Sequence, residues 1–445
     1  MKYILICILL NIIFTSGTLL ASEPDTLNVG EIESIRIDSI RLSGNNVTQD
    51  FIILRELTFK KGDVVNGKIL QYNKERIFSL QLFNKVEFFI IHENDMNILL
   101  ISVKESWYIY PLPFVRSREG DIHKTTFGVN LNYKNFRGRD ETLQAAAAVG
   151  YDPYYSIAYQ NPALFFENDI GLTASASYSK VFNNSENALL ITGTDFQYTM
   201  FVSEFTLSKR LDQFNLISVS FGYNYIESPY SGIYGISASG LNIDRFILFG
   251  GSYQLDTRDL KQYSENGLYS SIEYYHKGFL ENNISYNLLQ LDLRSYHTLI
   301  ENLSAKVRVA YRGTFGDVVP FYDYSILDYN GFLVRGHRNE HPEAHNMIVT
   351  SAEISYPILS EWDFSIKLPL LPERLTSARI GIYISGFYDA GTAYNNESPV
   401  ALNSFLSGYG LGISFLVLPY YGLRFEYALN ERGSGEFSIG SGVSF

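Results

Sequence analysis

The hydrophobic pattern of the chain changes near Trp107. Beyond it, apolar and polar residues alternate in one segment after another. Across 170–179, for example, Ile, Leu, Ala, Ala and Tyr alternate with Gly, Thr and Ser. Because successive side chains of a strand point to opposite faces, this period of two predicts strands with one apolar and one polar face. Residues 31–105 instead mix helical and strand spacings, so the pattern predicts two parts, at 31–105 and 107–445.

The alternating part has the pattern of a transmembrane barrel. In 289–294, 307–312 and 423–427, charged residues recur on one face only. The apolar face of a membrane barrel meets lipid, and its polar face lines the lumen. A large soluble β-sandwich or propeller is the alternative, and it would have to turn these charged side chains inward. We therefore expect an antiparallel transmembrane β-barrel.

The number of strands follows from counting segments of about ten residues. The count is sixteen or seventeen, and the segments near 190 and 200 are interpreted as one long strand. Bacterial barrels have an even number of strands, so sixteen are expected. Residues 316–342 show no alternation and predict a long loop, a kind of segment that is usually functional or disordered.

The first part predicts a small α+β domain at 31–105. Its order is strand (35–42), helix (48–57), helix (67–82) and two strands (86–91 and 98–103), that is β-α-α-β-β. Thr48 is the expected cap of the first helix.

The N-terminus has the features of a secretory signal peptide at 1–22, followed by a short linker at 23–30. Lys2 precedes an apolar stretch, and Ala21 and Ser22 suit a cleavage site. The only cysteine, Cys7, lies in that stretch, so the mature chain would have no thiol for a disulfide, for catalysis or for a metal. No other apolar run approaches the roughly 20 residues of a membrane helix, which excludes a polytopic helical membrane protein.

The net charge and the absence of known motifs argue against several classes of function. The net charge is -12 without a basic cluster, which disfavours nucleic acid as a partner. The chain has no Gly-x-Ser-x-Gly elbow, Walker loop or dinucleotide fingerprint, so neither an enzyme nor a cofactor is predicted. His337, His341 and His345 would suit zinc on a helix, but Pro342 breaks such a helix, and a polar loop without metal is favoured.

The small domain resembles a polypeptide-transport-associated (POTRA) domain. The resemblance rests on residues 43–45 after the first strand, 62–63 between the helices, 83–86 entering the hairpin and 103–105 at its end. Any small α+β domain remains the alternative.

The barrel resembles the BamA/TamA-like outer-membrane family, also called bacterial surface antigens. The resemblance rests on residues 135–139, 159–162, 256–259 with Gly267, and the Val-Arg-Gly motif at 334–336. His337 stands where the family usually has Phe or Tyr. The resemblance implies a sixteen-stranded barrel in the bacterial outer membrane with its POTRA domain in the periplasm.

The same resemblance implies that the long loop is bound to the barrel wall through Val334, Arg335 and Gly336. This attachment is called the lock below. In the family, the motif arginine enters the lumen and pairs with acidic residues on following strands. Strand parity turns Glu353 and Asp389 inward, and we expect both to pair with Arg335.

The first and last strands must pair to close the barrel, and their residues predict that this junction, called the seam below, is weak. The first strand carries Pro111 and Pro113, and the last carries Gly440 and Gly442, all of which weaken ladder pairing. The alternative is that the two prolines mark a linker before the barrel.

The last residues also match the pattern by which outer-membrane barrels are recognised for assembly. That pattern is carried by Ser438, Gly440, Val443 and Phe445. It predicts that the protein is itself a client of the barrel assembly machinery.

From these features the leading hypothesis is that the protein assists insertion or assembly of outer-membrane proteins through POTRA β-augmentation and a lateral seam. Its expected partners are outer-membrane lipids, unfolded outer-membrane or secreted polypeptides, and accessory periplasmic proteins. The alternative is translocation of a dedicated polypeptide through the lumen, as in two-partner secretion. Those transporters usually have two POTRA domains. A third class is a passive porin or an adhesive surface protein, and a porin would not need residues 31–105.

Overall fold

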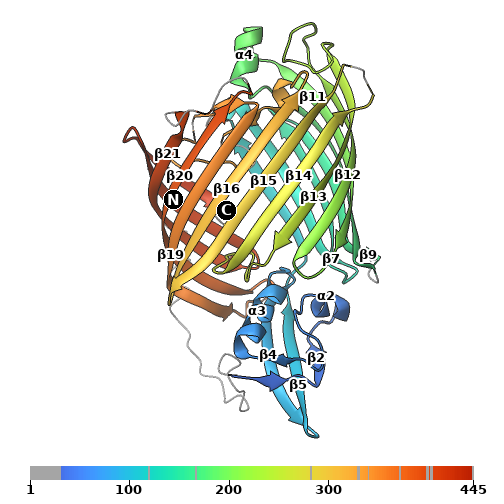
Figure 1. The fold of residues 1–445 in the computed structure, drawn as a ribbon, viewed down its shortest axis with the longest axis vertical. Helices are drawn as coiled ribbons and strands as arrows, with labels where there is room; N and C mark the ends of the chain where they lie inside the picture. The colour runs from blue at the N-terminus through green and yellow to red at the C-terminus, as the bar shows by residue number, and fades with distance from the viewer. Residues whose placement is uncertain are drawn as a thin grey trace.

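The computed structural model describes residues 32–118, 121–165, 168–280, 283–327, 331–338, 340–369, 372–396, 400 and 404–442. A small α+β unit lies directly beneath a large barrel-shaped sheet (Figure 1). The expected signal peptide and linker at 1–30 lie outside the described residues. Within the described part of the chain, no helix is long and apolar enough to cross a membrane.

The large sheet has sixteen strands, which confirms the predicted number. They are β6 (Ile109–Ser117), β7 (Thr125–Phe136), β8 (Glu141–Gly150), β9 (Tyr154–Phe165), β10 (Ile170–Phe182), β11 (Gln197–Arg210), β12 (Asn215–Glu227), β13 (Ile243–Asp256), β14 (Gly267–Gly278), β15 (Tyr286–Ile300), β16 (Leu303–Gly316), β19 (Asn346–Ser365), β20 (Ser377–Tyr394), β21 (Leu406–Leu418), β22 (Tyr421–Asn430) and β23 (Gly435–Ser441). Each strand pairs antiparallel with the next along this order.

The period-two pattern places side chains as predicted. Leu293 on β15 is 49% exposed on the outer face, whereas its neighbour Asp292 is 6% exposed and lies against Arg308 in the lumen. Apolar side chains thus cover the outside of the barrel, and charged side chains pair inside it.

The described residues of the long loop between β16 and β19 form only short elements: the 3-10 turn η4 (Phe321–Asp323) and the two-residue strands β17 (Ser325–Ile326) and β18 (Glu343–Ala344).

The interpretation of the segment near 190 as strand is wrong. Residues Glu186–Thr192 form helix α4, and β11 begins only at Gln197. The Ser185 hydroxyl accepts a hydrogen bond from the Ala188 N–H at 2.9 Å and caps the helix, which ends at Gly193 with φ +73°. The apolar run of the segment therefore belongs to a helix at the top of the barrel, at the end opposite the small unit (Figure 1).

The small unit contains β1 (Ile35–Arg36), β2 (Ser39–Ser43), α2 (Asp50–Leu54), β3 (Val64–Val65), α3 (Gly67–Phe78), β4 (Phe83–Glu93) and β5 (Met96–Glu105). Its main sheet has the order β2-β5-β4, with β2 parallel to β5.

Three local expectations for this unit are wrong. The first strand is split, because β1 pairs with β3 instead of continuing into β2. The second helix ends at Phe78, several residues before the expected end at 82. Thr48 does not cap α2, because its hydroxyl donates to Glu105 Oε1 at 2.9 Å and the helix begins two residues later.

Candidate functional site

The Arg335 guanidinium lies buried in the lumen among three carboxylates. Its Nε and Nη2 donate to Asp389 Oδ2 and Oδ1 at 2.6 and 2.8 Å. Its Nη1 donates to Glu353 Oε2 at 3.2 Å and to Glu426 Oε1 at 3.0 Å. Arg335 is 3% exposed, and the Phe387 ring centroid lies 3.6 Å from its guanidinium carbon. This geometry uses four of the five N–H groups of the planar guanidinium and fixes the long loop to strands β19, β20 and β22.

Further cations balance this acidic cluster. Lys306 Nζ lies 3.4 Å from Glu353, and Arg424 Nη1 lies 3.2 Å from Glu426. Arg338 from the same loop reaches Glu426 at 3.5 Å. Charges buried away from water are stable only when they are paired in this way.

Sequence reasoning did not assign Glu426 or Gly408 to this site. Glu426 shares inward parity with Arg424, so the alternation of 423–427 contained the signal for it. Gly408 on β21 lies against the loop backbone, where a Cβ atom would come within 1.8 Å of the Arg335 carbonyl oxygen. That contact joins residues far apart in the chain, so strand parity gives no signal for Gly408.

Val334 and Gly336, on either side of Arg335 in the motif, also help to position the loop. Val334 is buried in an apolar cluster with Phe332, Met347 and Val349. Gly336 adopts φ +94°, a conformation that favours glycine.

His337 stands where the motif usually has an aromatic residue, and its ring makes polar contacts. Its Nε2 lies 2.8 Å from Glu431 Oε2 and 3.1 Å from the Ser407 carbonyl oxygen, and its Nδ1 lies 3.2 Å from Glu340. Among the described residues, no three His, Cys, Asp or Glu side chains are arranged to hold a metal ion.

Strands β6 and β23 are the two ends of the sheet, where the sequence predicts the seam. Across the described residues, no ladder pair or backbone hydrogen bond joins these two strands. Pro111 and Pro113 lie inside β6, opposite Leu131 and Val129 of β7, and so face the lipid side. The two prolines are therefore part of a barrel strand rather than of a linker.

The C-terminal candidates lie on or just after β23. Ser438 and Gly440 face Glu426 and Arg424 of β22. Gly442 follows the strand with φ +84°, and its N–H donates to the Gly422 carbonyl oxygen at 2.7 Å. Val443 and Phe445 lie outside the described residues.

The small unit is docked onto the lower mouth of the barrel (Figure 1). Arg210 Nη1 and Arg76 Nη2 donate to the two oxygens of Glu56, at 2.6 and 2.9 Å. Burial alone would raise the pKa of Glu56, but the Arg210 and Arg76 guanidinium groups outweigh it and hold that pKa below its usual value. Glu56 thus joins an arginine of the barrel to one of the small unit.

A second set of contacts surrounds helix α3. Arg379 of β20 donates to Glu75 at 2.7 Å, and the Tyr72 hydroxyl donates to the Thr257 carbonyl oxygen at 2.9 Å. The Ser79 hydroxyl, just after the helix, accepts from the Lys261 N–H at 3.0 Å. The turn between β13 and β14 therefore forms a docking surface for α3.

The same turn enters the barrel. Tyr263 is 3% exposed, and its ring lies 4.1 Å from that of Tyr383, centroid to centroid. Leu260, Leu416 and Leu418 continue one apolar cluster from the lower lumen into the core of the small unit. The small unit and this turn therefore pack together against the lower opening of the barrel.

Known proteins show the same architecture. Residues 135–445, more than half of the chain, match the Omp85 superfamily domain. The chain belongs to the Omp85 superfamily. Residues 35–106 match the POTRA family, described as a surface antigen variable number repeat. This Omp85 protein lies in the outer membrane, with its POTRA domain in the periplasm.

A curated relative is the outer membrane protein assembly factor BamA of Buchnera aphidicola, which is 23% identical over 219 residues. The match covers 48% of this chain and 34% of BamA, so this chain spans about a third of that relative.

Solved structures share the fold. BamA from Haemophilus ducreyi lacking POTRA domains 1–3 superposes with a TM-score of 0.51 at 16% identity, covering 92% of this chain and 84% of that one. CdiB from Acinetobacter baumannii has a TM-score of 0.51 at 16% identity, covering 92% and 73%. CdiB from Escherichia coli has a TM-score of 0.52 at 11% identity, covering 92% and 75%.

Proposed function

We propose that this protein assists the insertion or assembly of proteins in the outer membrane through its seam. The observation that carries the proposal is the lack of ladder pairing between β6 and β23 across the described residues. Unpaired backbone groups in hydrocarbon are costly because no water is present to bond them. An incoming β-strand can satisfy both edges, and the seam is therefore a template for strand addition.

The POTRA domain offers a second edge for extended polypeptides. Strand β2 lies at one border of the β2-β5-β4 sheet, and β5 pairs with it on its inner side only. A client strand added to β2 would be held by main-chain hydrogen bonds, which recognise extended backbone with little dependence on sequence. Residues 31–105 form the periplasmic receiving domain in this proposal, and 107–445 form the barrel.

The proposed partners follow from these two edges. They are unfolded outer-membrane or secreted polypeptides, the surrounding lipids and accessory periplasmic proteins. The activity is strand exchange and involves no bond-making chemistry or cofactor. The C-terminal residues Ser438, Gly440, Val443 and Phe445 make the protein a client of the barrel assembly machinery during its own biogenesis.

Translocation of a dedicated polypeptide through the lumen is the second candidate, favoured by the shared fold with the CdiB proteins. In this structure Arg335 of the long loop is bound inside the lumen, and the POTRA domain is packed against the periplasmic mouth. A translocator of this design would have to release both obstacles, whereas strand addition at the seam requires neither.

Photo-crosslinking in cells distinguishes the two routes. A photoreactive residue is placed at Val115 on β6, at Ser175 facing the lumen, or at Leu293 on the lipid face of β15 as control. Insertion predicts crosslinks to nascent outer-membrane barrels from position 115 and none from 175 or 293. Crosslinks from position 175 alone would overturn the proposal in favour of translocation.

A further inference from the structure

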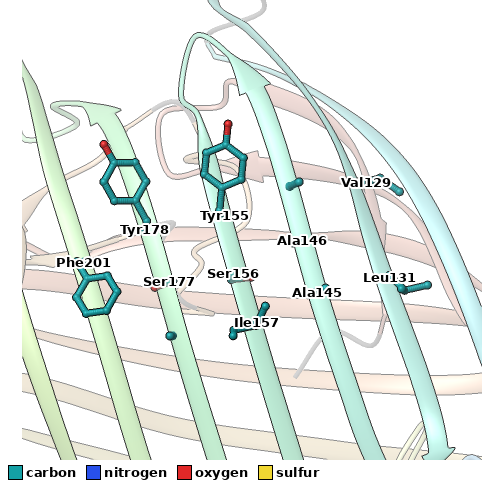
Figure 2. A pocket seen from close by; sticks show the side chains of 12 residues that line it. Val129, Leu131, Ala145, Ala146, Tyr155, Ser156, Ile157, Ser177, Tyr178 and Phe201 are labelled. Carbon is teal, nitrogen blue, oxygen red and sulfur yellow. The ribbon is translucent and has the colours of Figure 1, made fainter.

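A groove of about 560 Å³ crosses the outer face of the barrel over strands β7 to β11 (Figure 2). Its floor is formed by small side chains, including Ala145, Ala147 and Ala176. Its walls are larger side chains, among them Leu131, Ile157, Tyr155 and Phe201. The barrel surface is hollowed here because β8 carries alanines where the neighbouring strands carry Val, Leu, Ile and Tyr at the paired positions.

The groove lies in the extracellular half of the barrel wall. Strands β8 and β10 end beside it at the extracellular side, and Tyr155 is the second residue of β9 after the extracellular turn. Aromatic girdles mark the level of the membrane interface in outer-membrane barrels. A concave apolar surface at this depth is surrounded by hydrocarbon, so its natural occupant is an acyl chain of the outer leaflet.

The upper rim of the groove carries groups suited to an anionic head group. Tyr155 and Tyr178 lie side by side with ring centroids 6.4 Å apart, and both hydroxyls point toward the extracellular end (Figure 2). Neither hydroxyl has a hydrogen-bond partner among the described residues. Lys180 lies two residues beyond Tyr178 on the same face of β10, and its side chain is exposed. Within the described part of the chain it makes no ion pair.

We propose that this groove is a binding site for one phosphorylated, multiply acylated lipid of the outer leaflet. One acyl chain fills the groove over Ala145 and Ala147. A phosphate group accepts hydrogen bonds from the Tyr155 and Tyr178 hydroxyls and pairs with the Lys180 ammonium group. Charge complementarity at the rim selects this lipid over an uncharged one, because the floor alone would accept any hydrocarbon chain.

Native mass spectrometry of the full-length protein in neutral detergent tests the site, with bisphosphorylated lipid A as the probe and dephosphorylated lipid A as the comparison. The double variant Ala145→Leu/Ala147→Leu fills the floor. The matched control, Ala352→Leu, makes the same substitution on the lipid-facing side of β19. Slower migration of each protein after heating shows that the barrel is folded.

We expect one retained lipid on the wild type and on Ala352→Leu, and about tenfold weaker retention on the filled variant. Lys180→Ala should weaken retention of the bisphosphorylated probe severalfold and leave that of the dephosphorylated one unchanged. Equal retention by the filled variant and the wild type would overturn the site. Equal binding of both probes by the wild type would overturn the head-group selection. A dimer that the filled variant abolishes would identify a second copy of the chain as the occupant and overturn the lipid assignment.

Discussion

The Arg335 guanidinium and the Asp389 carboxylate form two parallel hydrogen bonds, at 2.6 and 2.8 Å, inside the barrel lumen. This pair connects the long extracellular loop to β20, and Glu353 and Glu426 extend the connection to β19 and β22. The loop is therefore held against the strands that lead to the C-terminal side of the seam.

The first prediction concerns this lock. Arg335→Ala leaves three buried carboxylates without their shared partner, and breaking a buried pair costs about 3 to 5 kcal/mol. We expect a lower temperature at which the folded barrel converts to its unfolded form on a gel. The control is Arg432→Ala, which breaks the exposed pair with Glu340 and should have little effect. An unchanged conversion temperature for Arg335→Ala would show that the lock contributes nothing to barrel stability.

The second prediction concerns the close approach at Gly408. A Cβ atom there would lie 1.8 Å from the Arg335 carbonyl oxygen, so the loop backbone must move. We expect Gly408→Ala to destabilise the barrel by about 1 to 3 kcal/mol and to raise protease sensitivity of the loop. Gly386→Ala is the matched control, since its new Cβ would meet only Leu411 at an ordinary 3.8 Å. Equal protease sensitivity in the two variants would contradict this contact.

The third prediction concerns the docking of the POTRA domain. Glu56→Gln removes the charge that Arg210 and Arg76 share, so the domain should separate from the barrel more often. Spin labels at Lys60→Cys and Leu211→Cys report this separation as a broader distance distribution by pulsed electron paramagnetic resonance. Because the pKa of Glu56 is lowered in the docked state, its contribution to docking is present above its usual pKa and is lost as pH falls through the lowered value. A distribution that is unchanged by Glu56→Gln and by acidification would contradict this role.

The fourth prediction concerns Asp140, in the periplasmic turn between β7 and β8. Burial raises its pKa to about 6, although Arg55 lies 3.4 Å away and acts in the opposite direction. Because the pKa of Asp140 is raised in the folded state, its protonation stabilises the fold at pH values below the usual pKa of aspartate. This stabilisation is lost as pH rises through about 6. The free energy of unfolding of Asp140→Asn minus that of the wild type should therefore increase by about 1 to 3 kcal/mol as pH rises from 4 to 7. Parallel pH profiles of the two proteins in a denaturant titration would rule this out.

The features that the sequence predicts are those that depend on local pattern. The sixteen strands and the inward direction of Glu353 and Asp389 follow from the period of two, which requires only neighbouring residues. The helix Glu186–Thr192 was missed because a short apolar run is compatible with either a strand or a helix.

What the sequence does not predict depends on contacts between distant segments. Glu56 lies between Arg76 and Arg210, whose positions in the chain give no sign that they meet. The docking at the periplasmic mouth results from many such contacts, including that of Tyr263 with Tyr383. These relationships follow only once the POTRA domain has been placed against the barrel.

Locking the seam tests the central claim most directly. Leu112→Cys on β6 and Gly440→Cys on β23 both face the lumen side, opposite Asn130 and Arg424. A disulfide between Leu293→Cys and Val309→Cys, which join strands already paired, serves as the locked control.

The readout is the amount of other outer-membrane barrels assembled in cells under oxidant, with a reductant added afterwards. The seam account predicts that only the seam disulfide lowers assembly and that the reductant restores it. Full assembly with the seam disulfide formed would contradict the account.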